Sequence, residues 1–384
     1  MFYYIIRLYV RIVFVFFFKS IRVKERGVFN QKGPLLLACN HPNSFLDAII
    51  LGAKFNHPVH FLARGDAFKN PFVKKLLSAL KAIPIYRLKK GREYLSLNDA
   101  TFEKCTSILE RGGIVLIFSE GLCMNQWELR PLKKGSARIA LGAWNNKIQN
   151  LKVIPVTLNY NSFRVFRKRM VIEFQEAIQK KDIRGLTESE QINNFNDLLY
   201  DKLQKGVLFS KNKEKVVQWI LSNEKRFQHP GSVSSLKQLQ EKIKVHELEN
   251  EIGRLDEPGI TALDERSACK AGILVILLLV PAVIGLLLNY PIYYLLKKVI
   301  ALKTANTVFY DSALFAAILL IYPLYYSALN LIGFLFIRNE VLQAMLIFMP
   351  LISLATFMVK DNLQAIINYL ILNKDTRSKL RGII

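Results

Sequence analysis

A histidine and an aspartate six positions apart are the residues of this sequence best suited to chemistry. His41 and Asp47 lie in the run Cys39-Asn40-His41-Pro42-Asn43-Ser44-Phe45-Leu46-Asp47, between an apolar and an amphipathic stretch. A neutral imidazole can remove the proton from an attacking hydroxyl, while a carboxylate fixes the tautomer of the ring and stabilises the imidazolium that forms. The pair therefore predicts a general base that activates the attacking hydroxyl directly, so that no Ser or Cys nucleophile is needed.

The two side chains can meet only in one local structure. Residues six apart point about 240° away from each other on a straight helix, so His41 must lie in a loop before the helix that carries Asp47. We expect a strand over Pro34–Cys39 and a helix over Ser44–Phe55. A structural alternative stays open, because Ser44-x-x-Asp47 is also the pattern of a capping box at a helix N-terminus.

A basic segment follows the histidine, and it contains one arginine directly after a short apolar run. Arg87 ends the run Ile83-Pro84-Ile85-Tyr86-Arg87. Its guanidinium suits a phosphate group, which it can bind through two hydrogen bonds. For the surrounding lysines we favour a solvated basic face against anionic lipid, and we predict a substrate role for Arg87 alone.

Another apolar run ends in a polar turn. The predicted strand Gly113–Phe118 is followed by Ser119, Glu120 and Gly121. A glycine allows the backbone to approach a ligand closely. The alternative is a simple strand-ending turn with a solvated glutamate. Further on, Gly135-Ser136 opens a predicted helix that could hold a phosphate on its free N–H groups, within a basic stretch that contains Arg130, Lys133, Lys134 and Arg138.

Taken in order, these segments resemble the conserved blocks of the glycerophospholipid acyltransferases, the family of lysophosphatidic acid and glycerol-3-phosphate acyltransferases. That family usually has four residues between its His and Asp, whereas this chain has five, a His-x5-Asp variant. Its third block usually reads Phe-Pro-Glu-Gly, and Ser119 replaces the proline here. Val153-Ile154-Pro155-Val156 matches its fourth, apolar block. The resemblance covers roughly residues 30–160.

The resemblance implies an O-acyltransferase that moves an acyl group from acyl-CoA or acyl-carrier protein to a hydroxyl of 1-acyl-glycerol-3-phosphate. Glycerol-3-phosphate, another lysolipid or an aminolipid remains open as the acceptor. The resemblance also implies that His41 and Asp47 are catalytic, that Arg87 binds phosphate and that Glu120 binds the glycerol or headgroup of the acceptor. The substrate-binding set that it implies is Arg87, Glu120, Gly121, Ser119 and Asn43.

The composition agrees with a lipid-facing protein. The 384 residues carry 54 Lys and Arg against 30 Asp and Glu, a formal charge of +24, and 51% are hydrophobic. The long uncharged segments argue against a nucleic-acid partner. They favour a membrane, in which anionic headgroups lie beside the hydrocarbon.

We predict no cofactor and no metal, because His, Asp and Glu are not at ligand spacings and the four cysteines form no Cys-x-x-Cys pair. A different class also stays open, a non-catalytic membrane protein that binds anionic lipid.

The elements that position these residues read as an α/β domain, in which a mixed sheet is flanked by helices. Short apolar runs and amphipathic helices alternate over 30–185, which we expect to be the acyltransferase domain. One helix is expected from near Asp99, as its N-cap, to Leu109, with Gly112-Gly113 as its stop. A polar helical extension over 186–264 follows, with apolar residues at helical spacing such as Leu236, Leu239 and Ile243.

Both ends of the chain are predicted to meet the membrane. The N-terminal segment, 1–29, contains an apolar helix with Arg7 and Arg11 on one face, and it is expected to lie in the bilayer interface or to be a retained anchor. The C-terminal region, 265–384, is expected to be a transmembrane helical domain. The resulting prediction is an integral membrane protein with its catalytic domain in the cytoplasm.

Three C-terminal segments are long and apolar enough to cross a bilayer. They are Gly272–Leu296, Ser312–Phe336 and Val341–Val359. Positive charge flanks both ends of the first segment, which disfavours a simple crossing. Pro281 and Pro291 would allow a re-entrant or interfacial hairpin instead, so two to four crossings remain open.

Overall fold

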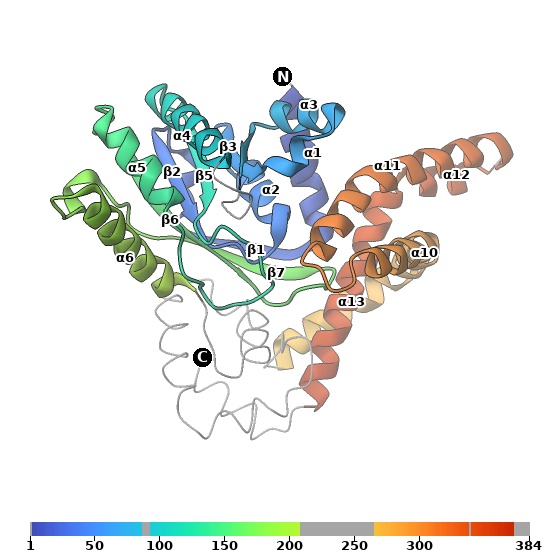
Figure 1. The fold of residues 1–384 in the computed structure, drawn as a ribbon. Helices are drawn as coiled ribbons and strands as arrows, with labels where there is room; N and C mark the ends of the chain where they lie inside the picture. Colours follow the sequence, from blue (N-terminus) through green and yellow to red (C-terminus); the bar gives the residue numbers. More distant parts are fainter. Residues whose placement is uncertain (1, 87–92, 208–264, 338, 372–384) are drawn as a thin grey trace. The chain divides into compact units, whose positions relative to one another are not determined.

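The chain divides into two units in the computed structural model, which describes residues 2–86, 93–207, 265–337 and 339–371 (Figure 1). The first unit comprises Met1–Tyr160 and Met170–Leu208. The second comprises Asn161–Arg169 and Phe209–Ile384. The predicted domain boundaries at 29, 185 and 264 stay predictions. The predicted helical pattern at Leu236, Leu239 and Ile243 lies outside the described residues.

The first unit is built on a seven-stranded mixed sheet with the order β1-β7-β6-β2-β5-β3-β4. Strand β2 pairs in parallel with β5 and β6, and β3 pairs in parallel with β4 and β5. Strands β6 and β7 pair antiparallel, which makes the sheet mixed. The predicted fold class of this unit is therefore confirmed. The strands are β1 (Phe18–Lys24), β2 (Leu35–Cys39), β3 (Val59–Arg64), β4 (Ala82–Ile85), β5 (Ile114–Phe118), β6 (Lys152–Tyr160) and β7 (Lys168–Phe174).

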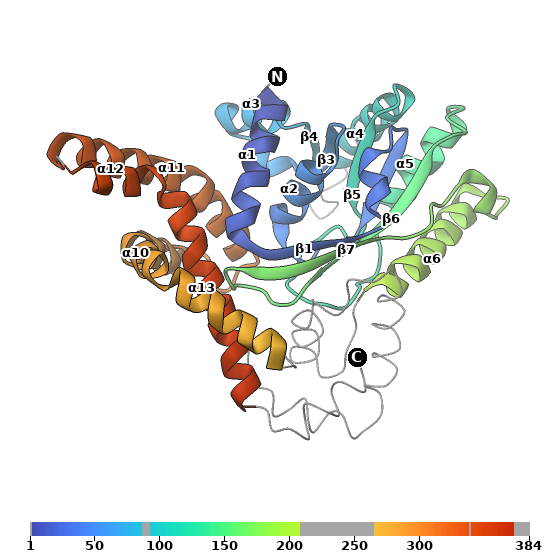
Figure 2. The ribbon, with the colours of Figure 1, turned by 180° about the vertical axis from the view of Figure 1, so that it is seen from behind.

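Helices cover both faces of this sheet, as the opposite views of Figures 1 and 2 show. On one face lie α4 (Glu93–Glu110), α5 (Gly135–Asn145) and α6 (Glu188–Gly206); on the other lie α1 (Phe2–Phe17) and α2 (Ser44–Lys54). A short helix, α3 (Pro71–Ala79), precedes β4. The predicted strand 34–39 and helix 44–55 are confirmed by β2 and α2, which place His41 in the loop between them.

The N-terminal helix packs within the first unit. Val10, Phe14 and Phe17 are buried. On the side that faces α2, Arg7 donates to the carbonyl oxygens of Phe55 and Asn56, and Arg11 to those of Ala53 and Lys54. The opposite side carries an exposed apolar stripe, Ile5, Leu8, Ile12 and Val15. The predicted shared face of the two arginines is confirmed, whereas insertion of this helix into a membrane stays a prediction.

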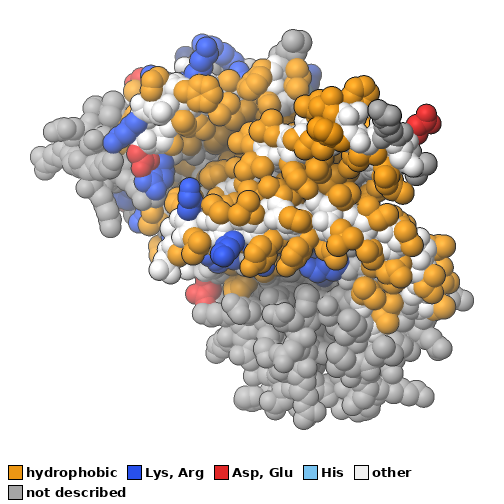
Figure 3. Space-filling model, turned by 90° about the vertical axis from the view of Figure 1, so that its right-hand side faces the viewer, with side chains coloured by type: hydrophobic (Ala, Val, Ile, Leu, Met, Phe, Trp, Pro, Cys, Tyr) orange, Lys and Arg blue, Asp and Glu red, His pale blue; other side chains and the backbone are white. Residues whose placement is uncertain are grey.

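The described part of the second unit contains apolar helices and the loop segment 161–169, whose last two residues, Lys168 and Arg169, begin β7. The helices are α10 (Glu265–Lys303), α11 (Tyr310–Phe336), α12 (Glu340–Ile347) and α13 (Met349–Ile371). By length and composition, Cys269–Lys303 and Tyr310–Phe336 could each cross a membrane. Figure 3 shows a broad hydrophobic surface over these helices, and strongly exposed apolar side chains include Ile276, Leu277, Val280, Leu324 and Phe334.

In this region the structure rules against the hairpin that was left open and divides one predicted segment in two. Helix α10 is continuous through Pro281 and Pro291, so the prolines do not produce a hairpin. Thr356 of α13 donates to the carbonyl of Ala282 at 2.9 Å, so a neighbouring helix hydrogen-bonds this stretch of backbone. The third predicted segment, Val341–Val359, is divided between α12 and α13. Pro350 explains the break, because a proline fits the first turn of a helix but not its interior.

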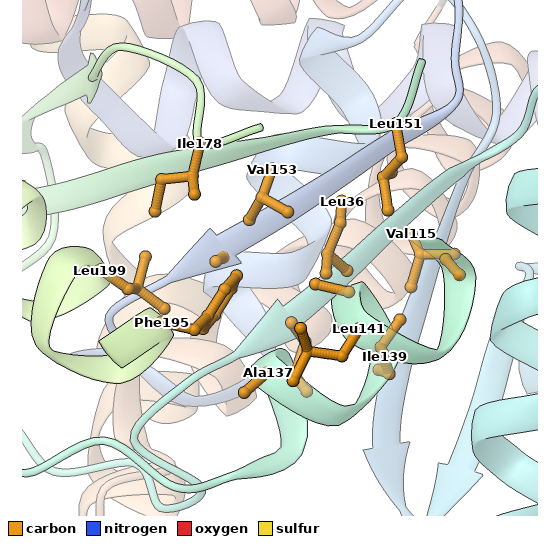
Figure 4. Packing of buried hydrophobic residues seen from close by; sticks show 14 of the residues in the cluster. Leu36, Val115, Ala137, Ile139, Leu141, Leu151, Val153, Ile178, Phe195 and Leu199 are labelled. Carbon is orange, nitrogen blue, oxygen red and sulfur yellow. The ribbon is translucent and has the colours of Figure 1, made fainter. Parts of the chain in front are cut away.

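The core of the first unit lies between the sheet and helices α4, α5 and α6. In Figure 4, Leu36, Val115 and Val153 of three adjacent strands face Leu141 of α5 and Phe195 of α6. Fully burying each such side chain contributes about 1.5–3 kcal/mol. This packing holds β2, β5 and β6 together, and β2 and β5 lead to the polar residues singled out in the sequence.

Helix α4 starts earlier than predicted. It begins at Glu93, so Asp99 lies inside the helix and the prediction of Asp99 as its N-cap is wrong. The predicted stop is confirmed, because Gly112 has a φ of 71° and the N–H of Gly113 donates to the carbonyl of Ile108 at 2.8 Å. A left-handed residue of this kind after a helix is usually a glycine.

Candidate active site

The parallel sheet brings the first and third polar segments together. Cys39 at the end of β2 is in register with Phe118 at the end of β5, so the residues that follow them leave the sheet at the same edge. The N–H of Ser119 donates to the carbonyl of Cys39 at 2.8 Å, which extends the pairing by one residue. His41 and Glu120 therefore lie side by side although 79 positions separate them.

His41 and Asp47 form a hydrogen-bonded pair. Nδ1 of His41 lies 2.9 Å from Oδ2 of Asp47, and Asp47 is fully buried. The ring of His41 stacks on that of Phe118, with 3.7 Å between centroids and 9° between planes. Because an ionised carboxylate only accepts hydrogen bonds, Nδ1 carries the proton of the neutral ring, and Nε2 has the lone pair that a base requires.

Asp47 also closes the N-terminus of its own helix. Its Oδ2 accepts from the backbone N–H of Asn43 at 2.8 Å. The N-cap is Asn43 rather than Ser44, and its side chain makes no capping bond. Ser44 has a φ of 51°, a left-handed conformation that is strained for a residue other than glycine. The capping box with Ser44 as its N-cap, which was the structural alternative, is therefore not formed, although Oδ2 of Asp47 does accept from a backbone N–H at the helix start as well as contacting the histidine.

Glu120 is held by two partners within the same loop system. Its Oε1 accepts from the N–H of His41 at 3.2 Å, and its Oε2 accepts from Nε of Arg130 at 2.7 Å. Only 5% of Glu120 is exposed. Burial raises the pKa of Glu120, whereas its bonds to Arg130 and His41 lower it. The contact with the backbone of His41 was not predicted, and a role of Glu120 in substrate binding stays a prediction.

The neighbouring residues of the third segment are also placed. Gly121 has a φ of 68°, and a Cβ there would lie 2.9 Å from Cγ of Lys133, so the turn favours glycine. Ser119 is buried and its hydroxyl lies 2.8 Å from that of Ser136, the second residue of α5. Substrate roles for Ser119, Gly121 and the buried Asn43 stay predictions, as does a phosphate at the start of α5.

Arg87, the predicted phosphate ligand, lies outside the described residues. Strand β4, which precedes it, runs parallel to β3 and ends at the same edge of the sheet as β2 and β5. Its role therefore also stays a prediction.

Cys123 lies in the loop after β5 and contacts the start of α2. Its Sγ accepts from the N–H of Ser44 at 2.7 Å. Burial, with a smaller contribution from the charge of Asp47, raises the pKa of Cys123 to about 12. The thiol is therefore protonated near neutral pH and is a poor nucleophile, which is consistent with a histidine that acts directly on the substrate.

Sequence reasoning missed two residues of this site. Tyr160, at the end of β6, donates from its hydroxyl to Oδ1 of Asp47 at 2.6 Å. Arg130 was noted only as part of a basic stretch, and it forms the ion pair with Glu120. A tyrosine at the end of an apolar strand was the available signal, because a buried tyrosine hydroxyl usually finds a polar partner.

Known proteins are similar to this part of the chain. The family model described as Acyltransferase matches residues 20–159. A 1-acyl-sn-glycerol-3-phosphate acyltransferase of Bacillus subtilis (strain 168) is 23% identical over 173 residues, which cover 44% of this chain and 79% of that protein. The crystal structure of the 1-acyl-sn-glycerophosphate (LPA) acyltransferase PlsC from Thermotoga maritima is similar with a TM-score of 0.40 and 18% identity, over 54% of this chain and 81% of that one.

The mixed sheet, the loop histidine and the family match define an acyltransferase domain. Within that class, this part of the chain resembles the glycerophospholipid acyltransferases, as its similarity to the 1-acyl-sn-glycerol-3-phosphate acyltransferase of Bacillus subtilis indicates.

Proposed function

We propose that this protein transfers a fatty acyl group from an acyl thioester to a hydroxyl of a glycerophospholipid precursor, with His41 as the general base. The observation that carries the proposal is the contact between His41 and the buried Asp47, which leaves Nε2 unprotonated and fixes the plane of the ring. The match of residues 20–159 to the acyltransferase family supports the class of reaction.

In this reaction Nε2 of His41 takes the proton of the acceptor hydroxyl while its oxygen attacks the thioester carbonyl carbon. The negative charge of Asp47 stabilises the imidazolium that forms. The tetrahedral intermediate then collapses, the carbon–sulfur bond breaks, and the departing thiolate takes the proton from His41. The products are an ester and a free thiol, and the histidine returns to its neutral form.

We propose 1-acyl-glycerol-3-phosphate as the acceptor and acyl-CoA or acyl-carrier protein as the donor. The name of the similar Bacillus subtilis enzyme supports this acceptor. Glycerol-3-phosphate and other lysolipids or aminolipids are the runners-up. Arg87 would bind the phosphate of the acceptor. The proposed reaction needs no cofactor and no metal, because the acyl group is already activated as a thioester.

We also propose that the protein is embedded in a membrane with the acyltransferase domain at the cytoplasmic face. The two apolar helices Cys269–Lys303 and Tyr310–Phe336 support the membrane by their length and composition. The exposed apolar stripe of α1 supports contact of that helix with the bilayer interface.

The test is an acyl-transfer assay over a panel of lysolipids with the purified protein in detergent. His41→Ala should lower the rate at least about 100-fold, the usual contribution of a general base. The matched control is His57→Ala, which removes a histidine outside the site. Near-normal transfer by His41→Ala would disprove the proposed role of this residue.

Asp47→Asn separates the enzyme from the alternative of a lipid-binding protein without catalysis. Asparagine keeps an oxygen for the N–H of Asn43, so the start of α2 should stay intact. It removes the charge that stabilises the imidazolium, so transfer should fall at least about 100-fold. A folded wild-type protein that neither transfers nor hydrolyses any thioester would favour the alternative.

A further inference from the structure

We propose that Tyr160 is a positioning residue, which orients Asp47 and through it His41; this inference deepens the proposed function and rests on it. The hydroxyl of Tyr160 donates to Oδ1 of Asp47 at 2.6 Å. Both residues are fully buried, and 113 positions separate them in the chain. The contact is therefore made by the fold, not by local sequence.

The three donors around Asp47 divide its two oxygens between them. Oδ2 accepts hydrogen bonds from Nδ1 of His41 and from the N–H of Asn43, and Oδ1 accepts one from the hydroxyl of Tyr160. With only Oδ2 bound, the carboxylate could turn about its χ2 torsion, which is broad for aspartate. Tyr160 holds the second oxygen and so fixes the plane of the carboxylate. It also supplies a hydrogen bond to a charge that has lost its contact with water.

Tyr160 is itself held at the end of β6. Its carbonyl oxygen accepts from Nε1 of Trp127 at 2.6 Å. Trp127 belongs to the loop between β5 and α5, which also contributes Glu120 and Arg130. The aromatic ring therefore occupies a defined place beside the pair, and because it is buried it acts through Asp47 and not on the substrate.

The test is Tyr160→Phe, which removes one hydroxyl and keeps the ring. Loss of one hydrogen bond to a charged group should lower kcat about tenfold with little change in KM. The matched control is Tyr3→Phe. Tyr3 is a partly buried tyrosine of the same unit, and its hydroxyl donates to the carbonyl of Gly52 near the other end of α2. This variant should keep the wild-type kcat, although it too loses a hydroxyl beside α2.

The pH–rate profile separates positioning from a general loss of stability. Without the donor from Tyr160, Asp47 exerts a stronger negative field on the imidazolium, so the acidic limb of the profile should move to higher pH. Weaker packing alone would lower the activity at every pH without moving that limb.

A second measurement does not depend on activity. In the full chain labelled with ¹⁵N in its histidine rings, the wild type should show His41 as the Nδ1-protonated tautomer, and Tyr160→Phe should change its tautomer balance and titration. An unchanged His41 signal would overturn the inference even if no substrate is found. Wild-type kcat in Tyr160→Phe would also overturn it. If instead the wild type transfers no acyl group but the signal of His41 changes, the proposed function fails and the positioning role stands.

Discussion

Glu120 is a buried carboxylate beside a cation, and its protonation should affect the stability of the fold. Burial raises its pKa above the ordinary 4.5, despite the opposing ion pair with Arg130. The folded protein therefore binds this proton more tightly than the unfolded chain does. The contribution to stability is complete below about pH 4.5 and is lost as the pH rises through the pKa of the folded state.

This linkage predicts a difference between the wild type and Glu120→Gln. The free energy of unfolding of the wild type, relative to the variant, should decrease from pH 4.5 towards neutral pH. Denaturant unfolding in mild detergent at a series of pH values measures it. Glu190→Gln should show the opposite sign, because hydrogen bonds from the backbone of Thr187 and Leu186 lower the pKa of Glu190. A difference for Glu120→Gln that does not vary with pH would contradict the prediction.

At the scale of the elements, α2 is fixed at both ends by residues from other parts of the chain. Its first turn holds Asp47 against Tyr160, and its last carbonyls accept from Arg7 and Arg11 of α1. Cations near a helix C-terminus are favourable because the last carbonyls carry a partial negative charge. Helix α1 therefore stabilises the helix that bears the aspartate.

We expect Arg11→Met to destabilise the C-terminal turn of α2 by about 1.5–3 kcal/mol, the usual range for hydrogen bonds to a charged group. Methionine keeps much of the apolar stem and removes the guanidinium. Hydrogen exchange at the amides of residues 51–56 should become faster in the variant. Ile12→Gln is the matched control, since Ile12 lies in the exposed stripe of α1 and should leave this exchange unchanged.

The elements near the histidine could be predicted from sequence because each has a local signal. The apolar run before Cys39, the helical spacing after Ser44 and the glycines after Leu109 each mark a strand, a helix or a stop. Helix geometry required His41 to lie in the loop before α2 if it was to meet Asp47, and the structure places it there. Tyr160 could not be found in this way, because its contact depends on how far β6 extends beyond Val156 and on the order of the strands.

At the scale of the whole molecule, the loop segment 161–169 leaves the sheet after Tyr160 and returns to it at Lys168, the first residue of β7, and it belongs to the second unit. There, Lys168 forms a buried ion pair with Asp311 at the start of α11, and the N–H of Arg164 donates to the same carboxylate at 3.1 Å. Arg167 pairs with Asp361 of α13 at 3.0 Å. These contacts attach the loop to the helices of the second unit.

The buried pair gives a prediction for this unit. Lys168→Met or Asp311→Leu alone leaves one buried charge without its ionic partner, and each should cost about 3–5 kcal/mol of stability. The double variant should cost clearly less than the sum of the two, because neither charge remains. The measurement is the free energy of unfolding, in detergent micelles, of the wild type, the two single variants and the double variant. Additive effects would show that the two side chains do not interact.

The loop 161–169 also means that the polypeptide passes between the units more than once. The chain enters the second unit after Tyr160, returns at Met170 and enters it again after residue 208. A protease site inserted between residues 208 and 264 would cut only the last of these passages. The N-terminal fragment would keep the loop with Arg164, Arg167 and Lys168, and the C-terminal fragment would keep Asp311 and Asp361. The two halves would then co-purify as a nicked protein held together without a peptide bond.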